Sequence, residues 1–215
     1  MSIAAPATAA PNGPLSAYAG VVATEQTWDS LKRFSVDEYH ALIAAGLFAE
    51  DENFELLEGL IVCKTTKHPP HWIATGLLRD ALIALAIPGF FVHSQNPVTT
   101  NDSEPEPDLA LVRGQPRDYL AGNPDPQQTP LVIEVADSSL ARDRLWKKRI
   151  YARAGIPVYW IVNLIDRQIE IYAQPSGPAE QPDYANCQII SAGGETPVVI
   201  DGQEVGRLVA KNILP

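Results

Sequence analysis

An acidic residue interrupts an apolar stretch that otherwise has the composition of a buried strand. Leu131, Val132, Ile133 and Val135 surround Glu134, and a continuous run of this kind is typical of a strand that is covered on both faces. A carboxylate in such a strand is costly to bury unless a cation, a metal ion or hydrogen-bond donors meet it. The chain must therefore fold so that a partner reaches Glu134.

A second acid begins the preceding apolar segment. Asp108 follows Pro107 and heads residues 109–112, which are all apolar. Because a proline fixes its own backbone torsion and restricts the residue before it, the chain is expected to be extended here. Asp108 should therefore start a strand next to the strand of Glu134, where two carboxylates can share one cation.

The segment that follows the Glu134 strand is strongly basic. Residues 142–153 contain six cationic side chains and a single acid, Asp143. Apolar residues at helical spacing, with Gly155 beyond them, predict a helix. Lys147 and Tyr151 lie four residues apart and should project from one helix face, so we expect Lys147 to lie over the two carboxylates. The charge by itself fits equally well with a helix face exposed to solvent.

Two further polar residues lie upstream of these segments. Glu55 alternates with apolar neighbours in a predicted hairpin over residues 53–63, a pattern that on its own favours an acid facing solvent. His71 lies in the first turn of a predicted helix that ends before Pro88, where it could be a site residue, a helix cap or an exposed imidazole. His68 is nearby, but no Cys or acid stands at zinc-ligand spacing, so zinc is not expected.

The remaining pattern predicts a domain that mixes helices and strands. A capping-box sequence at residues 35–38 should begin a helix, and the Glu134 strand, the basic helix and the next strand should form a right-handed parallel crossover. Residues 1–30 indicate a flexible tail, and residues 31–215 a single domain. Further strands are expected at residues 90–93, 97–100, 158–162 and 167–172, with short edge strands at 188–190, 197–200 and 205–209.

Composition limits the class of protein. The chain has 215 residues and a formal net charge of −10, which excludes a general nucleic-acid coating protein but permits an enzyme with a local basic groove. No run approaches the roughly 20 apolar residues that span a bilayer. Cys63 and Cys187 are too few for a disulfide framework. We therefore expect a cytoplasmic protein that does not enter a membrane.

Several motifs in combination are more specific than any single residue. They are EPEPDLALV at 104–112, EVADSSL at 134–140, Asp143 with Lys147, and YARAGIPVYWIV at 151–162. Together they resemble the restriction-endonuclease-like family that is expanded in cyanobacteria, a branch of the PD-(D/E)XK nuclease superfamily. Residues 54–59 and His71 also resemble the amino-terminal pattern of that family.

The resemblance implies an α/β (α+β) fold, in which helices flank a mixed central sheet, and a metal-dependent endonuclease. Mg²⁺ or Mn²⁺ would be held by Asp108, Glu134 and the carbonyl of Val135, and Lys147 would position the attacking water. Glu55 becomes a further acid of the site, with His71 and Tyr151 as accessory residues. Because neighbouring carboxylates repel each other, Asp108→Ala is expected to leave the fold intact or more stable.

One position departs from the superfamily pattern. Ala136 stands two residues after Glu134, where the superfamily has a lysine, and Lys147 would replace that lysine in space. Ala136 and the acidic net charge favour the alternative hypothesis, a catalytically inactive nuclease fold that binds nucleic acid or protein. A serine or cysteine hydrolase has little support, since the sequence lacks a Gly-x-Ser-x-Gly motif.

The expected partner is nucleic acid, with DNA favoured over RNA. Related nucleases pair two sites to cut two strands, so a homodimer is expected by analogy. Tyr159, Trp160 or the carboxy-terminal strands are candidates for its interface.

Overall fold

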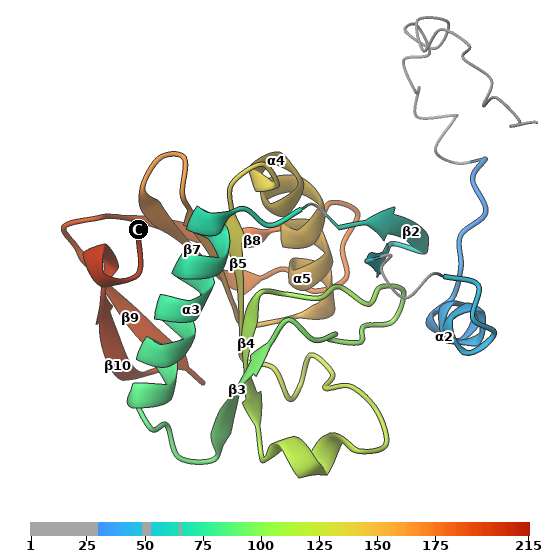
Figure 1. Cartoon of the computed structure of the whole chain (residues 1–215), viewed down its shortest axis with the longest axis horizontal. Coiled ribbons are helices and arrows are strands. Elements are labelled where there is room, and N and C mark those ends of the chain that lie inside the picture. Colours follow the sequence, from blue (N-terminus) through green and yellow to red (C-terminus); the bar gives the residue numbers. More distant parts are fainter. Residues whose placement is uncertain (1–29, 49–52, 65) are drawn as a thin grey trace, which may run out of the picture. The chain divides into compact units, whose positions relative to one another are not determined.

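A six-stranded mixed sheet is the centre of this computed structural model, which describes residues 30–48, 53–64 and 66–215 (Figure 1). The chain divides into two units, Met1–Lys32 and Arg33–Pro215, and the sheet belongs to the second. The predicted tail lies almost wholly outside the described residues. The strands, in their order across the sheet, are β3 (Phe90–Ser94), β4 (Leu109–Arg113), β5 (Leu131–Ala136), β6 (Val158–Asn163), β7 (Gln168–Pro175) and β8 (Tyr184–Ser191).

The pairing of these strands confirms the predicted mixed sheet. β5 and β6 are parallel, in register from Leu131 opposite Val158 to Ala136 opposite Asn163, and the other neighbouring strands are antiparallel. The crossover between β5 and β6 contains three helical segments in succession, α4 (Leu140–Arg142), the π-helical η3 (Asp143–Lys147) and α5 (Lys148–Ala154). Gly155 ends α5 in the left-handed conformation, as its position predicted.

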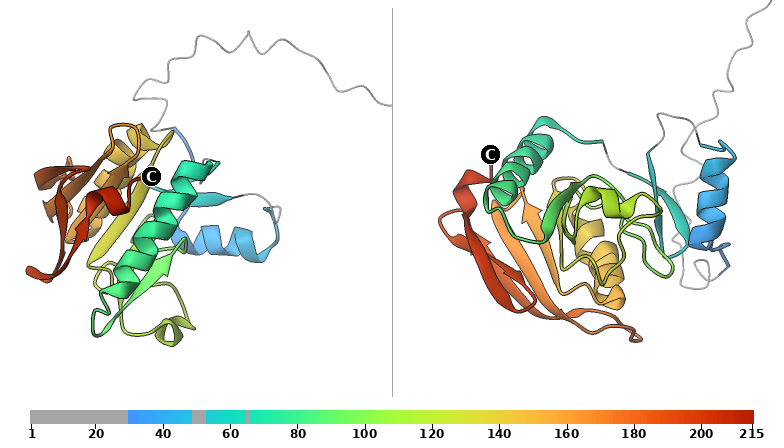
Figure 2. Two further views of the ribbon diagram at one scale, coloured as in Figure 1. Left: turned by 60° about the vertical axis from the view of Figure 1, so that its left-hand side comes forward. Right: turned by 90° about the horizontal axis from the view of Figure 1, so that it is seen from below.

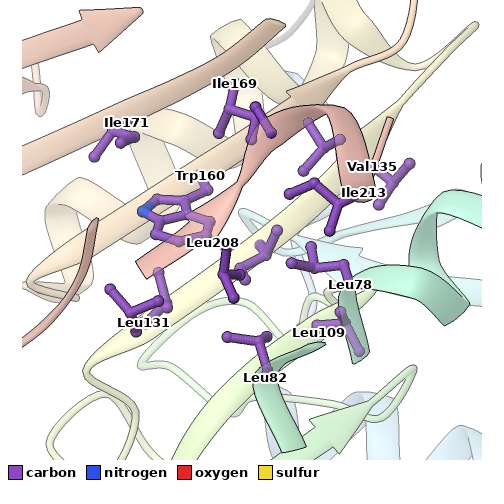
Figure 3. Close-up of a cluster of buried hydrophobic side chains, with 14 of the residues drawn as sticks. Leu78, Leu82, Leu109, Leu131, Val135, Trp160, Ile169, Ile171, Leu208 and Ile213 are labelled. Atoms are coloured by element: carbon purple, nitrogen blue, oxygen red, sulfur yellow. The ribbon is translucent and has the colours of Figure 1, made fainter. Parts of the chain in front are cut away.

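The two faces of the sheet bury different side chains. On one face, α3 (Pro69–Ala84) and the hairpin of β9 (Glu195–Ile200) and β10 (Gln203–Val209) enclose an aliphatic core around Trp160 (Figures 2 and 3). After β10, the short 3-10 helix η4 (Ala210–Asn212) brings Ile213 into the same core. On the other face, α5 covers a cluster that contains four tyrosines, Tyr151, Tyr159, Tyr172 and Tyr184. Burial on both faces explains the continuous apolar sequences of β5 and β6.

The amino-terminal part of this unit is a helix followed by a hairpin. α2 (Val36–Ala44) begins with the predicted capping box, in which Ser35 and Glu38 each bond to the other's backbone N–H. β1 (Phe54–Leu57) and β2 (Leu60–Cys63) form the predicted hairpin, with its turn at Glu58–Gly59. The Glu58 carboxylate binds Arg149 and Arg153 of α5, which fastens the hairpin to the crossover.

Three expectations are wrong. Residues 97–100 form no strand, because Val98 and Thr99 donate to loop carbonyls, those of Pro105 and Pro124. β9 and β10 pair with each other in a separate sheet, so β3 and β8 are the edge strands of the central sheet. Tyr159 and Trp160 are fully buried and therefore cannot form a dimer interface.

The connection between β4 and β5 contains the short 3-10 helix η2 (Pro116–Tyr119). Among the described helices, none combines the length and the apolar character needed to cross a bilayer.

Candidate active site

A cavity of about 600 Å³ lies between the amino-terminal hairpin, the start of α3, the β4–β5 edge and the crossover helices. Acidic and cationic side chains line it in similar numbers. Five of the site residues predicted from the sequence are among them: Glu55, His71, Asp108, Glu134 and Lys147. Tyr151 reaches the same group from behind Glu134. The further charged residues of the wall are Lys64, Lys67, Glu106, Arg142 and Asp143.

Asp108 sits directly before β4 and is held at both carboxylate oxygens. Oδ2 accepts the N–H of Val135 at 2.9 Å and lies 3.1 Å from Nε2 of His71. Oδ1 accepts the ammonium of Lys67 at 3.0 Å. Burial by itself would raise the pKa of Asp108, but His71, Lys67 and the Val135 N–H together lower it to about 2. Asp108 is therefore ionised at neutral pH.

This environment argues against the expectation that Asp108→Ala leaves the fold intact or more stable, which rested on repulsion between carboxylates. The donors around Asp108 lower its pKa, so removing its carboxylate relieves no net repulsion, and alanine would leave the buried N–H of Val135 without an acceptor. His71 is buried against Asp108, so the interpretations as an exposed imidazole or a cap are wrong. The predicted role of the Val135 carbonyl as a metal ligand stays a prediction.

Glu134 shares the ammonium of Lys147 with Glu55. Nζ of Lys147 is 2.8 Å from Oε1 of Glu134 and 3.0 Å from Oε2 of Glu55. The hydroxyl of Tyr151 donates to the same Glu134 oxygen at 2.8 Å. Burial raises the pKa of Glu134 to about 8, against the attraction of Lys147. Although burial opposes it, the surrounding acids raise the pKa of Lys147, which stays an ammonium group.

The position of Lys147 differs in one respect from the prediction. We expected its ammonium to lie over Asp108 and Glu134, but its second carboxylate is Glu55. The physical reason is that Asp108 already has Lys67 and His71, whereas Glu55 is buried in β1 and needs a cation. The interpretation of Glu55 as an acid facing solvent is therefore wrong, because the side chain is buried at the wall of the cavity.

The π-helical segment η3 fixes the direction of the helix side chains. Asp143 and Lys147 are its first and last residues, and both are buried. Ser139 donates its hydroxyl to Asp143 at 2.6 Å, and Tyr159 donates to the Asp143 carbonyl at 3.2 Å. Single turns of π-helix occur often at functional sites. Here the turn brings Lys147 onto the same side as Tyr151, one α-helical turn further along.

Lys67 is a residue of the site that was not predicted from the sequence. It lies in the connection between β2 and α3, outside any regular element. Its spacing of four residues before His71 was the available signal, because both side chains reach Asp108. A lysine in a loop gives no pattern of its own, so only the fold reveals its contact.

The residues of the cavity fit a divalent cation. Oε1 of Glu55 is buried beside the cavity and has no hydrogen-bond partner among the described residues, and the nearest Arg142 nitrogen is 3.9 Å away. Carboxylate oxygens are the ligands that Mg²⁺ and Mn²⁺ prefer. Within the described residues, no group of three or more His, Cys, Asp or Glu side chains is already arranged as a metal site. The ligands would instead be the two carboxylates of Asp108 and Glu134 together with water molecules, a combination that suits Mg²⁺.

Comparison with known proteins agrees with this fold. The solved structure of "a putative nuclease belonging to DUF820 from Anabaena variabilis ATCC 29413" aligns with a TM-score of 0.61 and 13% identity, covering 84% of this chain and 97% of that one. At that identity the similarity establishes only that the two chains share a fold.

The model of the Uma2 family, described as "Putative restriction endonuclease", matches residues 36–203. The chain therefore belongs to the Uma2 family. No curated protein sequence matches it.

Proposed function

We propose that this protein is a metal-dependent endonuclease that hydrolyses phosphodiester bonds of nucleic acid, with DNA as the preferred substrate. The observation that supports this most strongly is that Asp108, directly before β4, and Glu134, in the adjacent strand β5, line one cavity together with Lys147. Two oxygen ligands and a nearby ammonium are the groups that metal-assisted phosphodiester hydrolysis needs.

In this proposal each side chain has a separate task. Asp108, Glu134 and the carbonyl of Val135 would hold Mg²⁺ or Mn²⁺, which when bound lowers the pKa of a water molecule. Lys147 and Tyr151 both bond to Oε1 of Glu134, which leaves Oε2 without a hydrogen bond from the described residues. Lys147 can also orient the attacking water or stabilise negative charge on the phosphate, because its side chain lines the same cavity.

A cleavage assay tests this proposal. Purified protein with Mg²⁺ or Mn²⁺ is incubated with supercoiled plasmid and, separately, with single-stranded RNA. We expect cutting of the plasmid, and we expect Glu134→Gln to slow it by about a hundredfold or more because the metal loses a charged ligand. Glu170→Gln is the matched control, since Glu170 is an equally buried acid that does not line the cavity.

Equal rates for the Glu134→Gln variant and the unchanged protein would contradict the proposal. The second candidate function is an inactive nuclease fold that binds nucleic acid. It is favoured by Ala136, which leaves the usual lysine position apolar and buried. Binding of the plasmid without any cutting, unchanged by Glu134→Gln, would support that second function.

The proposed assembly is a homodimer that cuts both strands. Light scattering on the purified protein measures its mass directly.

A further inference from the structure

The two carboxylate oxygens of Asp108 are bound in different ways. Oδ2 faces the protein, where the N–H of Val135 and the ring of His71 hold it. Both of these donors belong to regular elements, β5 and α3. The partner of Oδ1 is the ammonium of Lys67 at 3.0 Å. Oδ1 is therefore the oxygen that a cation in the cavity can approach, once Lys67 moves.

Lys67 differs from Lys147 in how firmly it is held. The Lys147 side chain is 4% exposed and lies between two carboxylates. The Lys67 side chain is 36% exposed, and among the described residues it forms an ion pair with Asp108. Its backbone lies two residues before the first residue of α3 and outside any helix or strand. A long flexible side chain at such a position can change rotamer without disturbing the core.

We propose that Lys67 competes with the divalent cation for Oδ1 of Asp108, so that metal binding displaces the Lys67 ammonium. The inference rests on the proposed metal site. A ligand oxygen lies about 2.1 Å from Mg²⁺, and an ammonium kept 3.0 Å from that same oxygen would lie close to the metal and repel it. Lys67 thus neutralises Asp108 when the metal is absent and leaves it when the metal binds.

The displaced ammonium has an obvious second partner. Lys67 lines the cavity and is partly exposed, so after moving it stays beside the position that a phosphate of the substrate would occupy. A phosphate there stabilises the displaced Lys67, and by linkage nucleic acid and metal each increase the affinity for the other. Lys67 is therefore a positioning residue: it changes the affinity of the site for the metal and does not take part in the reaction itself.

The test is a titration with Mn²⁺ alone, without nucleic acid, in which electron paramagnetic resonance counts the free ion. We expect Lys67→Met to bind Mn²⁺ about tenfold more tightly than the unchanged protein, because a competing charge has been removed. Lys67→Arg should bind as the unchanged protein does. Lys64→Met is the matched control, since Lys64 lines the same cavity but pairs with Glu106, and its affinity should rise less than about threefold.

Each other outcome has a definite meaning. Equal or weaker Mn²⁺ binding by Lys67→Met overturns the competition, as does an equal gain in Lys64→Met, which would reflect net charge alone. If Mn²⁺ binds and Glu134→Gln weakens it, the proposed metal site stands whatever Lys67 does. If no variant binds Mn²⁺, the proposed site and the competition both fail. Thermal unfolding of each variant shows that it is folded.

Discussion

Asp108 and Glu134 lie on neighbouring strands but have opposite electrostatic environments. Donors surround Asp108 and lower its pKa, whereas burial dominates at Glu134 and raises it. A pair of acids whose environments separate their pKa values in this way is common at catalytic sites. In the proposed enzyme, Asp108 is the permanently charged ligand, whereas burial favours the protonated form of Glu134 and Lys147 opposes it.

Glu170 is a buried acid whose function is structural. Burial alone would raise its pKa, but hydrogen bonds from Arg144, Asn163 and Tyr172 lower it to about 2. Its folded pKa is thus below the unfolded value of about 4.5. The carboxylate therefore contributes stability above pH 4.5, and this contribution is lost as the pH falls from about 4.5 to 2.

This environment predicts how the free energy of unfolding depends on pH. Between pH 5 and pH 2.5 the unchanged protein should lose about 2 kcal/mol through this one group. Glu170→Gln should be less stable than the unchanged protein at pH 7, and the difference should shrink at low pH. Urea unfolding at several pH values measures this, and a difference that stays constant with pH would refute the assignment.

At the scale of elements, most helices and strands follow from local patterns. The capping box of α2, the glycine end of α5 and the apolar runs of β5 and β6 were all visible in the sequence, because each depends on residues close together in the chain. The failures depend on tertiary context. Residues 97–100 have the composition of a strand, yet their backbone groups bond to loops, and nothing local shows that β9 and β10 leave the central sheet.

Two glycines with empty space around them predict opposite effects of alanine. Gly155 ends α5 at a φ of +77°, whereas Gly76 lies inside α3 with an ordinary helical φ, and an added Cβ would meet no atom within 4 Å at either position. We expect Gly155→Ala to destabilise the protein by about 1 kcal/mol, because left-handed backbone strains an alanine. We expect Gly76→Ala to stabilise it by about the same amount.

Urea unfolding of the two variants gives both values. Because each change adds the same methyl group, the comparison isolates the backbone conformation from side-chain packing. Destabilisation by Gly76→Ala, or none by Gly155→Ala, would show that φ is not the deciding quantity.

On the scale of the whole molecule, the site joins segments that are far apart in the sequence. Glu55, Asp108, Glu134 and Lys147 come from β1, the start of β4, β5 and the crossover helix. The sequence could predict that Glu134 needs a cation, since that requirement is local. It could not predict that Lys147 serves Glu55 as well or that Lys67 serves Asp108, since those contacts depend on how the hairpin and α3 pack.

A protein with a net charge of −10 can bind nucleic acid only if cationic side chains are concentrated at the binding site. Lys64, Lys67 and Arg142 line the cavity together with its acids. A divalent cation would add positive charge at the same place, so metal and phosphate are expected to bind together. The net negative charge would limit non-specific binding.

The central claim is that carboxylates from β4 and β5 hold one divalent cation in the cavity. A crystal grown with Mn²⁺ tests it through the anomalous signal of the metal. We expect a single strong peak within about 2.3 Å of oxygens of both Asp108 and Glu134, with Lys67 turned away from Asp108. A peak that contacts neither carboxylate, or no peak in the cavity at saturating Mn²⁺, would contradict the claim.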